Sequence, residues 1–365
     1  MKSTLLIIGL ASLKAVFIAV FFALTLAVIL VWMERRQSAM IQDRLGPNRA
    51  NIGRWKLWGL LHVVASGLQM FFKEDFVPGK ANRFLFALAP VLALAPAFIV
   101  FGVIPFGDAY CWGKGLQAVA DTSTCEPLQV ARLDVGLLFY FAVASLSVYG
   151  LTLAGWASYN KWSLLGGLRA ASQSISYEVT MGMALVGVFL VYDSLEPGAI
   201  VRAQGANVLD WGFVRQPVGF VLFTIAAIAE TKRAPFDHPE GESEIVGFFC
   251  EYSGMRFGMF YFAEFVEVVF AATMITTVFF GGWQIPFLST AQLAAWGWPH
   301  LLVTLLQVAC FSLKVFFFCF LQLSIRWALP RVRPDQLMQI GWTRVLPASI
   351  ANVVVTAGVL LALRK

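Results

Sequence analysis

The sequence predicts an all-α integral membrane protein with about eight transmembrane helices and one interfacial amphipathic helix. Hydrophobic residues make up 59% of the 365 residues and charged residues only 13%, which is more apolar surface than a water-soluble core can bury. The apolar residues form continuous runs of about 20, the length that an α-helix needs to cross a bilayer. They do not alternate as barrel strands would, and backbone polar groups in lipid need internal partners, so helices are expected.

The apolar runs predict eight spans within a single polytopic membrane domain that covers residues 1–365. The first run is too long for a cleavable signal peptide and ends in Glu34-Arg35-Arg36 instead of small residues. No internal repeat and no linker divides the chain. The expected spans are 5–33, 84–105, 135–156, 175–192, 211–229, 257–280, 301–329 and 345–363.

The fifth run is unusually short. Its uninterrupted apolar part, 218–229, holds 12 residues, or about 18 Å of helix, whereas the hydrocarbon layer is about 30 Å thick. The helix must therefore carry Arg215 or Glu230 to membrane depth, where charged groups face protein or water. We expect Glu230 to be a buried carboxylate and the loop after it to fold back into the protein.

Lysine and arginine predict the orientation. The loops 34–83, 157–174, 230–256 and 326–344 together hold 18 of them, and the opposite side, with both termini, holds seven. Positive loops stay in the cytoplasm, so both termini are expected in the periplasm of a bacterium whose inner membrane the chain crosses. The net charge of +6 follows from this asymmetry and gives no indication of nucleic-acid binding.

The segment 34–83 has two halves. The first is basic and rich in turn residues around Gly46-Pro47-Asn48. The second, Trp55–Phe72, carries apolar residues at helical spacing, but too few in a row to span a membrane. It is expected to lie at the interface as an amphipathic helix. The alternative is a docking face for a partner protein, and both can hold.

Metal and redox motifs are absent from the sequence. No CxxC or HxxxH spacing occurs, and neither a GxGxxG nor a P-loop motif is present, so no metal, cluster or nucleotide is expected on this chain. Any redox centre must belong to a partner. Cys111 and Cys125 fall in one outer loop, where an oxidising periplasm permits a disulfide; the alternative is two unpaired thiols.

Charged residues interrupt several spans. Glu178 lies near the start of the fourth span, and Glu264 and Glu267 are three residues apart in the sixth, near one helix face. Lys314 is about 13 residues inside the seventh span, and a pairing with Glu267 would reduce its desolvation cost. For any single glutamate, the alternative is a neutral carboxyl with a structural role.

The stretch ETKRAPFDHPEGESEIVGFFCEYSG, residues 230–254, holds six of the 21 acidic residues. Glu240, Glu242 and Glu244 alternate, so that an extended loop would bring them to one side. Close like charges and burial both raise a carboxyl pKa, and such a cluster can share protons near neutral pH. The alternative is a solvated acidic loop, but the prolines and phenylalanines around it favour burial.

Five motifs resemble one known family. They are ERRQSAMIQDRLGPNR (34–49), FFKED (71–75), ISYEV (175–179), ETKRAPFDHPEGESE (230–244) and EYSGMRFGMFYFAEF (251–265). Their order and spacing resemble the H-subunit family of NADH-quinone oxidoreductase, respiratory complex I, along nearly the whole chain.

The resemblance implies a quinone-binding membrane subunit without a redox centre of its own. The first span, interfacial helix and sixth span would frame a portal for quinone, and buried glutamates would couple quinone reduction to proton translocation. FMN and iron–sulfur clusters would lie in partner subunits of the peripheral arm, which also complete the quinone site. Small and antiporter-like membrane subunits would be the neighbours of this chain in the bilayer. The implied quinone-chamber residues are Arg35, Arg36, Arg44, Arg49, Lys73, Glu74, Asp75, Lys232, Arg233 and Asp237. The implied proton relay is Glu178, Glu230, Glu240, Glu242, Glu244, Glu251 and Glu264.

The chain departs from the family pattern in a few places. The interfacial helix has His62, Ser66 and Gln69 where the family commonly has Gln, Asp and Lys, so an Asp–Lys charge pair is replaced by neutral groups. Glu267 and the cysteine-containing outer loop are also outside the pattern. One alternative is the membrane anchor of a related hydrogenase-like or ferredoxin-linked complex. Another is a stand-alone secondary transporter, although paired half-repeats are lacking.

Overall fold

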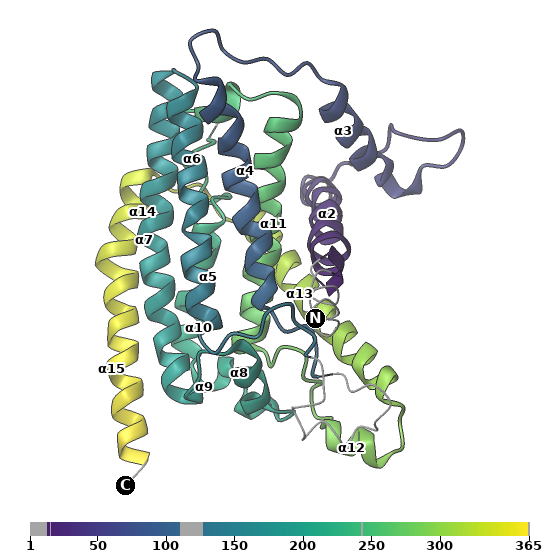
Figure 1. The fold of residues 1–365 in the computed structure, drawn as a ribbon, viewed down its shortest axis with the longest axis vertical. Coiled ribbons are helices and arrows are strands. Elements are labelled where there is room, and N and C mark those ends of the chain that lie inside the picture. Colours follow the sequence, from purple (N-terminus) through teal and green to yellow (C-terminus); the bar gives the residue numbers. More distant parts are fainter. Residues whose placement is uncertain (1–12, 15, 110–126, 242–243, 364–365) are drawn as a thin grey trace, which may run out of the picture.

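The computed structural model describes residues 13–14, 16–109, 127–241 and 244–363. In this part of the chain all regular elements are helices and there is no strand, which confirms the predicted all-α membrane fold. Six helical segments are long and apolar enough to cross a membrane, and most of the long helices run side by side along the molecule (Figure 1). They are Arg83–Val103, Gly136–Ala157, Lys161–Tyr192, Gly254–Phe279, His300–Ala328 and Pro334–Leu363.

In chain order, a π-helical turn, Phe17–Leu24, leads into α2 (Thr25–Ile41), and α3 (Leu61–Phe72) follows after a long connection. The bundle continues with α4 (Arg83–Ile99), α5 (Gly136–Ala144), α6 (Leu146–Ala157) and α7 (Lys161–Tyr192). Two short helices, α8 (Pro197–Gln204) and α9 (Gly212–Arg215), precede α10 (Pro217–Glu230). The chain ends with α11 (Gly254–Phe279), α12 (Thr290–Ala295), α13 (His300–Ala328), α14 (Pro334–Ile340) and α15 (Leu346–Leu363).

Helix α10 has 14 residues and rises only about 21 Å, as the short apolar run led us to expect. It ends at Glu230, whose side-chain Oε2 atom is shielded from solvent. The loop that follows turns inward, and Lys232, Arg233 and His238 are buried in it. The expectation that this charged loop folds back into the protein is therefore confirmed.

Helix α7 corrects one expected boundary. The fourth span was expected to begin at residue 175, but α7 begins at Lys161, after Asn160 accepts a hydrogen bond from the Trp162 amide (3.0 Å). The first half of α7 has too many polar residues to be predicted as a span from hydropathy. These residues face protein instead of lipid, and Ser163 and Gln173 are fully buried. Consequently Glu178 lies in the middle of a 32-residue helix and not near its start.

Helix α11 forms the centre of the core. Of the 18 most apolar consecutive residues of α11, 83% are buried. The same fraction is 28% for α13 and 17% for the segment that contains α15. In Figure 1, α15 lies at one edge of the bundle. The outer faces of α13 and α15 are therefore available to lipid or to partner subunits.

Helix α3 lies at the edge of the molecule near α2 (Figure 1), packs against α11 through Met70 and Gly258, and has no fully buried residue. It begins at Leu61, later than the expected Trp55, because the residues before it form a β-bridge and a short 3₁₀ turn. In that turn Gly59 has φ +90°, and a Cβ there would lie 2.3 Å from the Pro47 carbonyl oxygen. Only glycine fits this approach.

A glycine contact between α4 and α6 gives a test of the packing. A Cβ at Gly150 would lie 2.5 Å from the Ala93 backbone nitrogen, and backbone cannot move aside as a side chain can. We expect Gly150→Ala to push α6 from α4 and to cost about 1–3 kcal/mol, measured as an earlier thermal transition of the purified protein. Gly182→Ala is the matched control, since its Cβ would only touch Phe141 at 4.0 Å. Equal transitions for the two variants would contradict the packing.

Candidate functional site

The candidate site surrounds the loop between α10 and α11, residues 231–253. Gln173 of α7 holds the start of this loop, because its Nε2 donates to the carbonyls of Ala229 (2.7 Å) and Phe236 (2.8 Å). Arg331, from the segment after α13, donates to the Asp237 carbonyl (2.5 Å). Two elements, α7 and the segment after α13, therefore fix the loop, which is needed before its charged side chains can occupy defined positions.

Arg233 is the centre of one buried charge network. Its Nη1 contacts Glu34 Oε2 at 2.9 Å and its Nη2 contacts Glu264 Oε2 at 3.5 Å, while Glu34 Oε1 also accepts from Arg326 at 2.5 Å. The guanidinium lies 3.7 Å from the centre of the Phe265 ring, a cation–π contact. Burial alone would lower the pKa of Arg233, but the Glu34 and Glu264 carboxylates outweigh it and raise the pKa. The network joins α2, α11, α13 and the loop.

Lys232 forms a second buried pair. Its Nζ lies 2.9 Å from Glu267 Oε2, and the lysine side chain is only 5% exposed. Burial lowers the pKa of Lys232, but the negative charges of Glu267 and Glu230 dominate and raise it. The ammonium group therefore stays charged between carboxylates of α10 and α11.

The expected pairing of Glu267 with Lys314 is wrong. Lys314 Nζ instead donates to the carbonyls of Phe280 (2.8 Å), Gly282 (3.0 Å) and Gln284 (2.7 Å). These carbonyls follow the C-terminal end of α11, the negative end of the helix dipole, which attracts a cation. Glu267 lies several turns earlier on α11 and pairs with Lys232.

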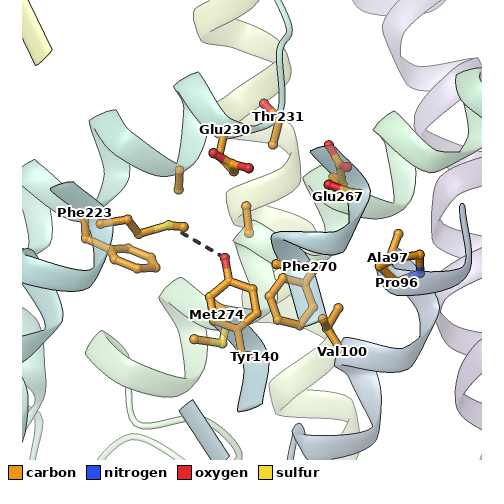
Figure 2. Close-up of a pocket in the computed structure, with 15 residues that line it drawn as sticks. Pro96, Ala97, Val100, Tyr140, Phe223, Glu230, Thr231, Glu267, Phe270 and Met274 are labelled. Atoms are coloured by element: carbon orange, nitrogen blue, oxygen red, sulfur yellow. Dashed lines mark hydrogen bonds between the residues drawn. The ribbon is translucent and has the colours of Figure 1, made fainter. Parts of the chain in front are cut away.

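Two small cavities connect the carboxylates. The first, of about 40 Å³, has Glu230, Thr231 and Glu267 at one end and Tyr140 with apolar side chains at the other (Figure 2). The Tyr140 hydroxyl contacts the sulfur of Met181 at 3.7 Å. Such a volume exceeds the space that one buried water requires, and polar partners are present.

The second cavity, of about 10 Å³, is lined by Glu267 as well, together with Lys232, Glu240 and Glu264. Ser147 of α6 and Glu267 line both cavities. Glu178 of α7 is close enough to Glu230 to interact with it electrostatically. Glu240, Glu264, Glu267, Glu230 and Glu178 thus form a series, and Glu267 stands between its two halves.

Other members of the expected relay lie elsewhere. Glu244 points to the surface and pairs with Arg169 at 2.8 Å, so it does not join Glu240. Glu251 accepts a hydrogen bond from Asn160 Nδ2 at 2.6 Å, in the connection between α6 and α7. Glu242 lies outside the described residues, as do Cys111 and Cys125.

Burial shifts the pKa values of three residues of the loop, Asp237, His238 and Glu240. Burial raises the pKa of Asp237 and, with the Asp237 charge, raises the pKa of Glu240 from 4.5 to about 7. Burial and then the Arg331 charge lower the pKa of His238 to about 4. The imidazole is therefore neutral at neutral pH, and Glu240 is the loop carboxyl poised to gain or lose a proton there.

The expected chamber residues of α2, α3 and the connection between them are braced in place. Arg35 donates to Ser66 Oγ (3.1 Å), Arg36 to the Leu45 carbonyl (2.8 Å) and Arg44 to Ser38 Oγ (3.1 Å). The Arg49 backbone amide donates to His62 Nε2 (2.9 Å).

The expected chamber residues beyond α3 meet the start of α11. Lys73 is the C-cap residue of α3. Asp75 pairs with Arg256 (3.3 Å), and the Glu74 carbonyl accepts from Ser253 (2.9 Å). None of these contacts involves Arg233, Glu34 or Glu264.

Glu34 and Arg326 are the functional candidates that sequence reasoning missed. The sequence gives one signal for both, because each is a charged residue at the end of an apolar run. Glu34 directly precedes Arg35, and Arg326 lies in the last turn of α13. Their pairing depends on which helices meet, which the sequence does not reveal. Within the described residues, no group of three or more His, Cys, Asp or Glu side chains could hold a metal ion.

The raised pKa of Glu240 can be tested by infrared spectroscopy of the intact protein. Glu240 should keep its proton at pH 6 and lose it as the pH rises through about 7, where an ordinary glutamate is already ionised. We expect a protonated-carboxyl band that disappears between pH 6 and 8. Glu240→Gln should abolish this band, and the control Glu244→Gln, at a surface ion pair, should retain it. A band unchanged in Glu240→Gln would contradict the assignment.

Known proteins match almost the whole chain. A family model described as NADH dehydrogenase matches residues 13–357. H subunit 2 of the NADH-quinone oxidoreductase of Geobacter metallireducens is 43% identical over 96% of this chain and 95% of its own length. H subunit 1 of the same enzyme from Cytophaga hutchinsonii is 38% identical, covering 95% and 96%. NADH-quinone oxidoreductase subunit 8 of Rhodothermus marinus is 43% identical, covering 91% and 92%.

These matches agree with the motifs that suggested the resemblance, and with a helical membrane fold whose site is rich in buried charge. The chain belongs to the NADH dehydrogenase family, among the members named as the H subunit of NADH-quinone oxidoreductase.

Proposed function

We propose that this membrane subunit forms the portal and part of the wall of a quinone chamber, and that its buried carboxylates transmit the charge change of quinone reduction into the membrane. The observation that carries the proposal is a series of buried carboxylates. Glu240, Glu264, Glu267 and Glu230 line two cavities that share Glu267, and Glu178 interacts electrostatically with Glu230. Its relatives are named as subunits of an enzyme that transfers electrons from NADH to a quinone.

The portal would lie between α2, α3 and α11. Helix α3 lies at the edge of the bundle without a fully buried residue, so an apolar molecule from the bilayer would meet its side chains. Its exposed large apolar residues, Val64, Leu68, Phe71 and Phe72, suit contact with lipid. The basic side chains of Arg35 and Arg36 on α2 would stabilise the negative charge of a reduced headgroup.

Charge transfer along the series would be electrostatic. Quinone reduction takes two electrons and two protons, so a transient negative charge at the chamber would raise the proton affinity of Glu240. Two charges about 4 Å apart interact by about 4 kcal/mol at an effective dielectric of 20, enough to shift a pKa by several units. Lys232 interacts with both Glu267 and Glu230. It would therefore allow a proton or a change of charge to pass from one of these carboxylates to the other beside the first cavity.

The remaining expectations on partners and placement are proposals as well. We propose that FMN and iron–sulfur clusters lie in partner subunits, and that the peripheral arm docks on the loops 34–83 and 230–256. Small and antiporter-like membrane subunits would lie against the outer faces of α13 and α15. Both termini would face the periplasm of a bacterial inner membrane, where a Cys111–Cys125 disulfide can form.

The test is NADH-driven quinone reduction and proton pumping by the intact complex in liposomes. Glu267 lines both cavities, so Glu267→Gln should lower coupled quinone reduction at least tenfold, a barrier change of about 1.4 kcal/mol, while the complex still assembles. The control is Glu251→Gln, at the side chain that accepts from Asn160, for which we expect near-normal rates. Full activity with normal pumping in Glu267→Gln would overturn the relay. Activity with hydrogen or ferredoxin in place of NADH would overturn the assignment of the electron donor.

A further inference from the structure

His62 occupies an unusual position at the second residue of α3. Its Nε2 atom accepts hydrogen bonds from two successive backbone amides, those of Arg49 (2.9 Å) and Ala50 (3.0 Å). A ring nitrogen that accepts must carry a lone pair, so the imidazole is neutral and its proton is on Nδ1. A side chain of the helix therefore satisfies two loop amides that would otherwise depend on water.

The loop that His62 holds is the turn-rich connection after α2. Arg36 donates to the Leu45 carbonyl (2.8 Å), which ties the beginning of the connection to α2. On the other side, Gly59 approaches so closely that its Cβ would lie 2.3 Å from the Pro47 carbonyl oxygen. The connection is clamped between the end of α2 and the start of α3, and His62 supplies the hydrogen bonds on the α3 side.

These bonds add to a small set of contacts that fix α3. The helix has no fully buried residue, and its packing on the bundle rests on partly buried side chains such as Val63, which contacts the hydrophobic core. Its other polar ties to α2 are Trp32 Nε1 to the Trp58 carbonyl (3.1 Å) and Arg35 to Ser66 Oγ (3.1 Å). Ser66 also donates to the His62 carbonyl (2.8 Å), and Gly258 of α11 packs against Met70. The two bonds at His62 therefore act together with the packing of α3 on α11, and they are the side-chain bonds that tie α3 to the Arg49 and Ala50 amides.

We propose that His62 is a positioning residue of the portal. Its neutral imidazole latches residues 46–50 onto α3 and so sets the separation of α2 from α3 and the direction of the Arg49 side chain. This inference rests on the proposed function, in which α2 and α3 frame the entry of quinone. The latch itself is a set of hydrogen bonds that can be measured without any quinone.

The first experiment is hydrogen exchange on the intact complex, read at the Arg49 and Ala50 amides. His62→Leu keeps the approximate volume but lacks an acceptor, and it should lower the protection of both amides by roughly two- to tenfold, the worth of one ordinary hydrogen bond. His62→Gln is the matched control, because its side-chain oxygen reaches about as far as Nε2 and can accept both bonds. Unchanged protection in His62→Leu would overturn the latch.

The second experiment measures quinone reduction with a short-chain ubiquinone analogue. In His62→Leu we expect the KM for the analogue to rise several-fold with kcat changed much less, because a displaced portal affects entry and not the chemistry. His62→Gln should have the wild-type KM, because it keeps the acceptor. If the position required histidine for another structural reason, His62→Gln would not have the wild-type KM. Lost amide protection with an unchanged KM would overturn the positioning role. A wild-type complex that does not reduce quinone would instead refute the proposed function, while the exchange result stands by itself.

Discussion

The arrangement depends on two adjacent cations, Lys232 and Arg233, that are buried where α10 ends too early to cross the membrane. A buried charge that loses its partner costs about 3–5 kcal/mol, so neither side chain can stay in this position alone. Glu267 pairs with Lys232, and Glu34 and Glu264 pair with Arg233. These carboxylates come from α2 and α11, which means that the loop can adopt this conformation only when both helices are in place.

The same pairing creates the chemistry of the site. Carboxylates gathered to neutralise two cations are also close to one another, and Glu267 lines both of the cavities at which Glu230, Glu240 and Glu264 lie. Because the cations compensate part of the negative charge, several carboxylates can lie close together at a lower electrostatic cost. A structural requirement of the loop and a proposed pathway for charge thus use the same side chains.

The sequence predicts the parts of this structure that depend on the length and composition of apolar runs. These parts are the helices, the shortness of α10 and the burial of the loop after Glu230. The prediction was wrong for the start of α7, because Ser163 and Gln173 are polar residues that face protein, and hydropathy cannot distinguish that environment from water.

Pairings were also beyond the reach of the sequence. The choice between Lys232 and Lys314 as the partner of Glu267 depends on the rotation of α11 and α13, and no local pattern encodes it. For the same reason Glu34 and Arg326 were missed, and Glu244 was expected in the buried cluster although Arg169 draws it to the surface. Residue type identifies the groups that need partners, whereas the packing of helices decides which partners they meet.

The most direct test of the central claim is a double-substitution cycle on Arg233 and Glu34, followed by the thermal stability of the intact complex. If the loop depends on this buried pair, Arg233→Gln and Glu34→Gln will each strongly lower the thermal stability of the complex. The double variant will then lose less stability than the sum of the two single variants, because the same interaction between Arg233 and Glu34 is lost in each of them. Destabilisations that simply add would show that the two side chains act independently and would contradict the dependence of the loop on this pair.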